Sequence, residues 1–129
     1  MDYTINRLIT GAEFDVVDAR TRAALAHNGF GVLTEIDVKA TMKKKLDVDM
    51  PAYRILGACN PKMALEAIGM EPRVGAMLPC NVIVREAAPG KVEVAAVDPV
   101  ASMSAIKNPQ LSEVAAGVRE LLADIVRQL

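Results

Sequence analysis

Two cysteines are the residues of this sequence best suited to covalent chemistry. Cys59 precedes Asn60 and Pro61, which suit the N-cap and first position of a helix, and Cys80 follows Pro79 at the start of a predicted strand. A helix N-terminus presents unpaired N–H groups and a partial positive charge, and both favour the thiolate, the reactive form of cysteine. We therefore predict that Cys59 is the nucleophile and that Cys80, which faces the core, is its partner.

The spacing of these thiols leaves three uses open. They are 21 positions apart, which fits neither the CxxC of thioredoxin-like redox sites nor a zinc pattern with four ligands. They could form a redox couple if their Cα atoms lie within about 7 Å. They could instead be buried hydrophobic residues, as free cysteines often are, or they could bind a soft metal such as Cu(I) together with Met63 and Met77. Zinc has less support, because the single histidine, His27, is expected near the C-terminus of a helix.

Two carboxylates form a second candidate site. Glu35 and Asp37 are two positions apart on a predicted strand, so their side chains share one face and could act as an acid/base pair. Asp37 is also placed to cap the helix that follows, whose basic run 43–45 is interpreted as a solvated terminus rather than a phosphate-binding patch. The sequence contains no glycine-rich phosphate loop, Ser-His-Asp set or nucleotide fingerprint, so we leave open whether the protein is an enzyme.

The composition bounds the size of the fold and the kinds of partner. A chain of 129 residues with 52% apolar and 24% charged residues is expected to form one domain, residues 1–129, and its 3% aromatic content leaves aliphatic side chains to fill the core. The net charge of −1 argues against a nucleic-acid or anionic membrane partner, and no run reaches the roughly 18 apolar residues of a membrane span. We expect a cytoplasmic protein with reduced thiols and no cofactor.

Apolar periodicity predicts an α+β fold with elements in the order β-α-β-α-β-α-β-β-α. Thr10 and Glu13 have the spacing of a capping box, which predicts a first helix from Gly11 to a stop at 28–29. The predicted strands cover residues 1–9, 31–37, 52–59, 79–86 and 91–97. The later helices are predicted to start at Asp37, at Asn60-Pro61 and at Asn108-Pro109, and a short helical turn at Asp98-Pro99. We expect one mixed, largely antiparallel sheet with helices packed mainly on one face.

Three segments resemble a known family. The stretches GFGVLTEIDV (29–38), YRILGACNP (53–61) and LPCNV (78–82) are similar, in that order, to motifs of the bacterial and archaeal family catalogued as domain of unknown function 302. The resemblance covers nearly the whole chain and implies a compact α+β protein, often a homodimer, with no established activity. The positions that match the family's motifs are Glu35, Asp37, Cys59, Asn60, Pro61, Pro79 and Cys80.

We therefore hypothesise a small cytoplasmic ligand-binding or thiol-redox module that uses Cys59 with Cys80 as its partner. The alternatives are a homodimeric interaction protein with structurally buried cysteines and a soft-metal, Cu(I)-binding protein. The expected partners are a second copy of the chain and a small-molecule ligand. The candidate binding residues are Glu35, Asp37, Asn60, Pro61 and Pro79.

Overall fold

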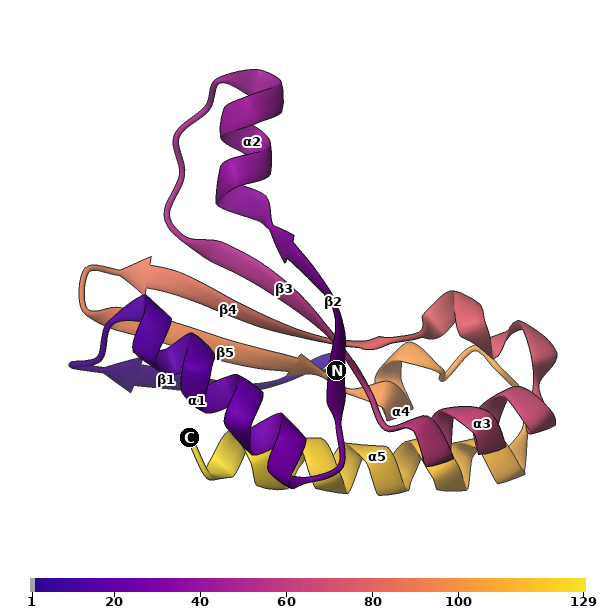
Figure 1. The fold of residues 1–129 in the computed structure, drawn as a ribbon. Coiled ribbons are helices and arrows are strands. Elements are labelled where there is room, and N and C mark those ends of the chain that lie inside the picture. The colour runs from indigo at the N-terminus through magenta and orange to yellow at the C-terminus, as the bar shows by residue number, and fades with distance from the viewer. Residues whose placement is uncertain (1) are drawn as a thin grey trace.

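The protein is built around one antiparallel sheet. The computed structural model describes residues 2–129, and Figure 1 shows the strands, which pair in the order β1-β5-β4-β3-β2. All four pairings are antiparallel, so the sheet that we expected to be mixed has no parallel pair within the described residues. The strands are β1 (Thr4–Thr10), β2 (Gly31–Asp37), β3 (Tyr53–Cys59), β4 (Cys80–Ala88) and β5 (Lys91–Val97).

Helices α1 and α5 lie against one face of this sheet (Figure 1). Apolar residues from both helices meet those of β3, β4 and β5 in the main core, and a second cluster lies where α3 packs on α5. The α+β class and the placement of helices on one face are therefore confirmed. The helices are α1 (Phe14–His27), α2 (Val38–Leu46), α3 (Pro61–Met70), the 3₁₀ helix η1 (Pro72–Met77), α4 (Pro99–Ser102) and α5 (Pro109–Arg127).

The face of the sheet turned away from α1 and α5 carries a row of apolar side chains. In the strand register Ala95 pairs with Ile83, Ile83 with Ile55, and Ile55 with Ile36, so the row crosses β5, β4, β3 and β2. Outward positions of a half-covered antiparallel sheet are usually polar. Ile36, at the edge of the sheet, remains 48% exposed.

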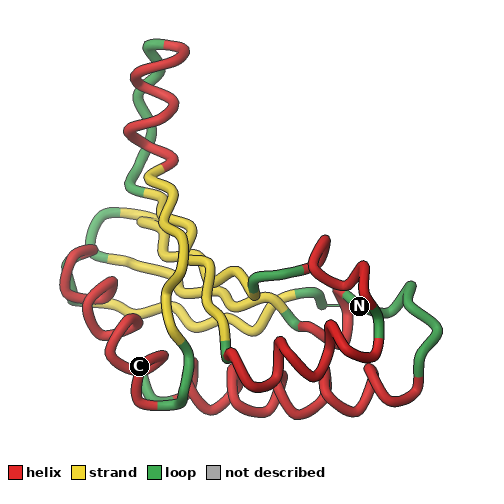
Figure 2. The backbone as a smooth tube through the Cα atoms, turned by 45° about the vertical axis from the view of Figure 1, so that its right-hand side comes forward, coloured by secondary structure: helices red, strands yellow, loops and turns green. Residues whose placement is uncertain are grey.

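Helix α2 projects away from the rest of the molecule, beyond the ends of β2 and β3 (Figures 1 and 2). None of its residues is buried. Strand β2, which leads into it, is an edge strand of the sheet, and all of its residues except Val32 are exposed. This end of the molecule therefore contributes little to the core.

Among residues 2–129, no helix has both the length and the apolar composition that crossing a membrane requires.

The first residues of the helices can be compared with the N-caps predicted from the sequence. Asp37, Asn60, Asp98 and Asn108 are the N-caps of α2, α3, α4 and α5, and each accepts a backbone N–H bond with its side chain, as predicted. The predicted capping box of the first helix is wrong. Glu13 itself is the N-cap and makes no side-chain cap bond, so α1 begins at Phe14 rather than Gly11.

Thr10 cannot serve as that cap because it pairs with Lys91 as the last residue of β1. The C-terminal stop was predicted correctly, since Asn28 is the C-cap of α1 and Gly29 has a φ of 83°. The 3₁₀ helix η1 was not predicted. Met1, which we included in the first strand, lies outside the described residues.

Candidate functional site

The two cysteines lie at facing ends of neighbouring strands. Cys59 is the last residue of β3 and Cys80 is the first residue of β4. The β3–β4 register pairs Cys80 with Ala58, so Cys59 is one residue out of step with Cys80, and their side chains leave the two strands towards opposite faces of the sheet. Both are free thiols; Cys80 is 7% exposed, whereas Cys59 is only partly buried.

The start of α3 fixes the position of Cys59. Asn60 accepts a hydrogen bond from the backbone N–H of Met63 with its Oδ1 atom, at 3.3 Å, and Pro61 occupies the first helical position. The carbonyl oxygen of Asn60 accepts the N–H of Ala64 at 2.9 Å and closes the first turn. Cys59 therefore directly precedes the N-cap of a ten-residue helix, as the sequence predicted.

Both cysteines line one small cavity. Its volume is about 30 Å³, and its lining, apart from Asn60, is apolar. This is room for one or two water-sized groups, far below the roughly 300–1,000 Å³ of a preformed site for an organic ligand. The lining includes Phe30, Cys59, Met63, Cys80, Met103 and Val118. We call this volume the cysteine cavity.

Pro79 closes one side of the cysteine cavity and packs on Gly57 of β3. A methyl group added to Gly57 would overlap Thr34 Oγ1 and lie 2.7 Å from Pro79 Cγ, so only glycine allows these segments to approach so closely. The predicted binding residues Asn60, Pro61 and Pro79 thus lie around the cysteines: Asn60 and Pro79 line the cavity, while Pro61 begins the adjoining helix.

Burial makes the two thiols chemically different. Removal from water, and to a smaller extent the negative charge of an ionised Cys59, together raise the pKa of Cys80 to about 11. Cys80 is therefore a neutral thiol at neutral pH.

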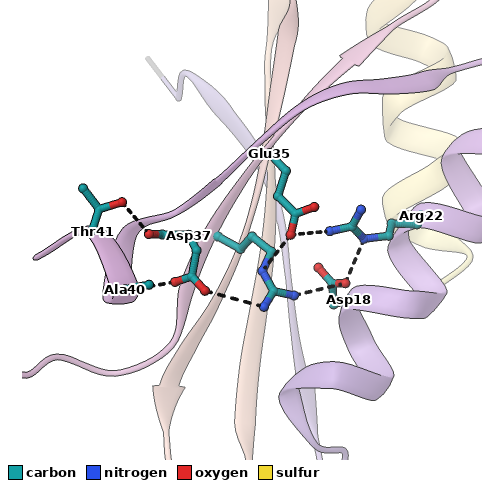
Figure 3. A network of polar contacts seen from close by, with 7 residues as sticks. Asp18, Arg22, Glu35, Asp37, Ala40 and Thr41 are labelled. Carbon is teal, nitrogen blue, oxygen red and sulfur yellow. Dashed lines mark hydrogen bonds and ion pairs between the residues drawn. The ribbon is translucent and has the colours of Figure 1, made fainter. Parts of the chain in front are cut away.

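The two predicted carboxylates belong to a different site, a cluster that we call the arginine network (Figure 3). Asp18 Oδ2 lies 2.8 Å from Arg22 Nε and 3.3 Å from Arg54 Nη1. Glu35 Oε1 lies 3.0 Å from Arg22 Nη2 and 3.3 Å from Arg54 Nε. Asp37 Oδ2 is 4.0 Å from Arg54 Nη2. The network ties α1 to β2 and β3.

Each carboxylate of this network already has a structural partner. Asp37 Oδ1 accepts the N–H of Ala40 at 2.9 Å and so caps α2. The hydrogen bond that Arg22 donates to Asp18 raises the pKa of that guanidinium, so it stays charged. The guanidinium of Arg54 also lies 5.1 Å from the ring centre of Phe14. The arginine network therefore resembles a structural clamp more than an acid/base pair.

The structure keeps these two sites apart. Arg54 and Cys59 lie near opposite ends of β3, five residues and roughly 16 Å apart along an extended strand.

Within residues 2–129, no group of three or more His, Cys, Asp or Glu residues is placed to hold a metal ion. Met77, which we had named as a soft-metal ligand, does not line the cysteine cavity and is 44% exposed, while Met63 and Met103 do line it.

The comparisons with known proteins agree with this fold. A family model described as domain of unknown function DUF302 matches residues 6–129. The chain belongs to this family. It is similar to the crystal structure of an uncharacterized conserved protein DUF302 from Bacillus stearothermophilus, with a TM-score of 0.86 and 25% sequence identity over 96% of this chain and 97% of that one. No curated protein matches the chain significantly.

Several residues of the two sites in this DUF302 protein were not predicted from the sequence. Asp18 and Arg22 had a local signal, because they are four positions apart on α1 and can pair along the helix. Arg54 had none, since its partners come from α1 and β2. Met103 lies in the turn after α4 and reaches the cysteine cavity only through tertiary packing.

Proposed function

We propose that this DUF302 protein is a thiol-based module of the cytoplasm in which Cys59 is the reactive thiol and Cys80 its partner. The observation that carries the proposal is the shared cavity, which joins a partly exposed thiol at a helix N-terminus to a buried one. Cys59 lies beside the positive end of α3 and is partly exposed, whereas burial keeps Cys80 protonated. The two thiols would therefore act in sequence.

The proposed reaction is exchange with a low-molecular-weight disulfide. The Cys59 thiolate attacks one sulfur atom of that disulfide, its S–S bond breaks, and one thiolate leaves as a mixed disulfide forms on Cys59. Cys80 then loses its proton and attacks Cys59 Sγ, which releases the second thiol and forms the Cys59–Cys80 bond. The protein is oxidised by two electrons, and the small disulfide is reduced to two thiols.

Glutathione disulfide tests this order of events. The wild-type chain is expected to release two equivalents of glutathione, and Cys80→Ser only one, because it stops at the mixed disulfide. Cys59→Ser is expected to release almost none over the same time. Intact-mass spectrometry distinguishes the three products. The proposal fails if Cys59→Ser reacts as fast as the wild type.

We also propose that two copies of the chain associate through β2 and the apolar row. The row of Ala95, Ile83, Ile55 and Ile36 ends at β2, whose outer edge has no strand partner within the described residues. Antiparallel pairing of two β2 strands about a two-fold axis would continue both the sheet and the row into the second copy. Such a dimer would satisfy the open edge of β2 and place Ile36, the exposed end of the row at 48%, beside the second copy.

The oligomeric state in solution tests the dimer. Ile36→Lys is expected to convert a dimer into a monomer, as measured by light scattering after size-exclusion chromatography. Leu65→Lys is the matched control, because Leu65 is 74% exposed on α3, away from the row. A wild-type monomer at high concentration, or an Ile36→Lys variant that remains dimeric, would contradict the proposal.

A further inference from the structure

We infer that the outer edge of β1, together with the groove between β1 and α5, binds an extended peptide that carries an acidic side chain. Strand β1 forms the edge of the sheet opposite β2, so this surface is separate from the cysteine cavity and from the proposed dimer contact. The inference goes beyond the proposed function and does not depend on it. It depends on unpaired backbone groups, a groove with an apolar lining and the charge of Arg7.

The backbone of β1 has one open edge. The carbonyl oxygen of Tyr3 accepts the N–H of Asp98 at 2.8 Å, and at the other end the N–H of Gly11 bonds to the carbonyl oxygen of Gly90 at 3.0 Å. Because backbone groups alternate in direction along an antiparallel strand, the odd-numbered residues between these two bonds face β5. The even-numbered residues point their N–H and C=O groups away from β5: Thr4, Asn6, Leu8 and Thr10. No other strand among the described residues pairs with that edge.

Strand β1 lacks the usual protection of an edge strand. Natural edge strands are commonly blunted by lysine, proline, a β-bulge or a very short length. This strand is seven residues long, contains neither lysine nor proline, and pairs with β5 from Thr4 to Thr10 without a register shift. An extended peptide can add to such an edge as a further strand through main-chain hydrogen bonds.

A groove of about 530 Å³ lies beside this edge, between β1 and the C-terminal part of α5. Half of its lining side chains are apolar; the lining comprises Ile5, Asn6, Arg7, Ala123, Val126 and Arg127. Ile9 belongs to the main core and Ile5 packs against it, so the side chain of Arg7, midway between them on the strand, leaves the sheet on the same face. Alternate side chains of an added strand would therefore enter this groove.

The charge of the groove selects the peptide. Arg7 Nη1 donates a hydrogen bond to the carbonyl oxygen of Arg127 at 2.7 Å, which holds the guanidinium over the end of α5. Arg127 pairs with Asp124, whereas Arg7 has no carboxylate within ion-pair distance in residues 2–129. The remaining N–H donors of Arg7 suit a carboxylate. We therefore expect an acidic residue opposite Arg7, with apolar residues two positions before and after it.

A second copy of the chain fits this edge less well than an acidic peptide. Antiparallel pairing of two β1 strands about a two-fold axis at their centre would place Arg7 opposite the partner's Arg7. Like charges directly opposite each other destabilise a cross-strand pair. A glutamate or aspartate at that position replaces the repulsion with an ion pair.

Fluorescence anisotropy with two synthetic peptides tests the charge preference. Both probes are capped, fluorescein-labelled seven-residue peptides of threonine with valine at the second and sixth positions; one has glutamate and the other lysine at the fourth. The full chain is expected to bind the glutamate probe about 10-fold more tightly than the lysine probe, and Arg7→Glu is expected to reverse the preference. Arg73→Glu, at an exposed position on η1, is the matched control and should keep the wild-type preference.

A proline substitution tests the addition of a strand. The N–H of Asn6 points away from β5, so Asn6→Pro removes a donor to the peptide without removing one to β5. It is expected to weaken binding of the glutamate probe about 5-fold, while Asn6→Ala binds like the wild type. Circular dichroism of each variant separates lost binding from lost folding.

Four results would overturn the inference: no binding of either probe at millimolar concentration, equal affinity for the two probes, full affinity in Asn6→Pro, or a dimer that Asn6→Pro converts to a monomer. The last result would assign the edge to a second copy. If Arg7→Glu does not fold, the two probes on the wild-type chain still decide the charge preference. Exchange with glutathione disulfide, measured separately, shows whether the proposed function stands without the peptide site.

Discussion

The cysteine cavity and the arginine network lie at opposite ends of β3. They differ in whether their reactive or charged side chains already have bonding partners. In the network, Asp18 and Glu35 each face two guanidinium groups, and Asp37 also caps a helix. The cavity is lined by two cysteines and two methionines, and neither cysteine forms a disulfide. Groups of opposite charge that pair with one another hold a fold together, even though Asp18 Oδ1 and Arg54 Nε of this network are buried without a hydrogen-bond partner, while unbonded thiols remain available for chemistry.

This comparison implies that substitutions at the two ends should have opposite consequences. Changes in the network should lower stability and leave thiol chemistry intact, whereas changes in the cavity should alter thiol chemistry at a smaller cost in stability.

Removal of Asp18 should cost the most stability. Asp18→Ala leaves Arg22 and Arg54 without their most buried partner, and removal of one member of a buried ion pair costs about 3–5 kcal/mol; we expect about 4 kcal/mol in urea unfolding. Asp124→Ala, which breaks the exposed pair with Arg127, is the control and should cost less than about 1 kcal/mol. A similar loss in both variants would show that the network is not a clamp.

Alkaline pH should destabilise the protein through Cys80. Its pKa is raised from 9.0 to about 11 in the folded state, so the unfolded chain loses this proton first. Stability is therefore complete below pH 9 and falls by about 3 kcal/mol as the pH rises through 11. Because lysine and tyrosine titrate in the same range, the quantity to measure is the difference between wild type and Cys80→Ala. An equal decline in both would show that Cys80 is not buried as a neutral thiol.

Gly57→Ala should disturb the wall of the cavity. The added methyl group meets Thr34 and Pro79, and overpacking of this kind costs about 1–3 kcal/mol; we expect about 2 kcal/mol. Gly69→Ala is the control, because a methyl group there meets open space. Chemical denaturation of the two variants gives the comparison. A Gly57→Ala variant as stable as the wild type would mean that Pro79 does not close the cavity as described.

Asn60→Ala separates capping from reactivity. Loss of an N-cap costs about 1 kcal/mol, and Asn108→Ala, which removes the cap of α5 and also the hydrogen bond that Asn108 Nδ2 donates to the Met70 carbonyl, should cost at least as much. Only Asn60→Ala should change the alkylation rate of Cys59, because only that cap orders the helix start beside the thiol. Equal alkylation rates of Cys59 in the two variants would show that the start of α3 does not affect the reactivity of this thiol.

The local part of this structure could be predicted from the sequence. Side-chain N-caps depend on a few neighbouring residues, and those at Asp37, Asn60, Asp98 and Asn108 were all predicted correctly. The capping box at Thr10 failed because β1 continues through that residue to pair with β5. At Thr10 the local capping pattern favours a helix start, but the residue pairs with β5 as part of β1 instead.

The two sites could be predicted only in part, because both depend on the register of strands distant in sequence. The burial of Cys80 followed from the alternation of β4 and was foreseen. The cavity that joins it to Cys59 depends on the β3–β4 register, and the pairing of Asp37 with Arg54 depends on the β2–β3 register. Periodicity indicates which face a residue occupies but not which residue of another strand lies beside it.

The central claim is that the cysteine cavity holds one reactive and one protected thiol. The most direct test is the rate of alkylation of each cysteine in the native reduced protein at neutral pH, followed by peptide mass spectrometry. We predict that Cys59 is labelled first and that Cys80 is labelled only at alkaline pH or after unfolding, because burial keeps it protonated and inaccessible. Labelling of Cys80 before Cys59, or of both at the same rate, would contradict the account.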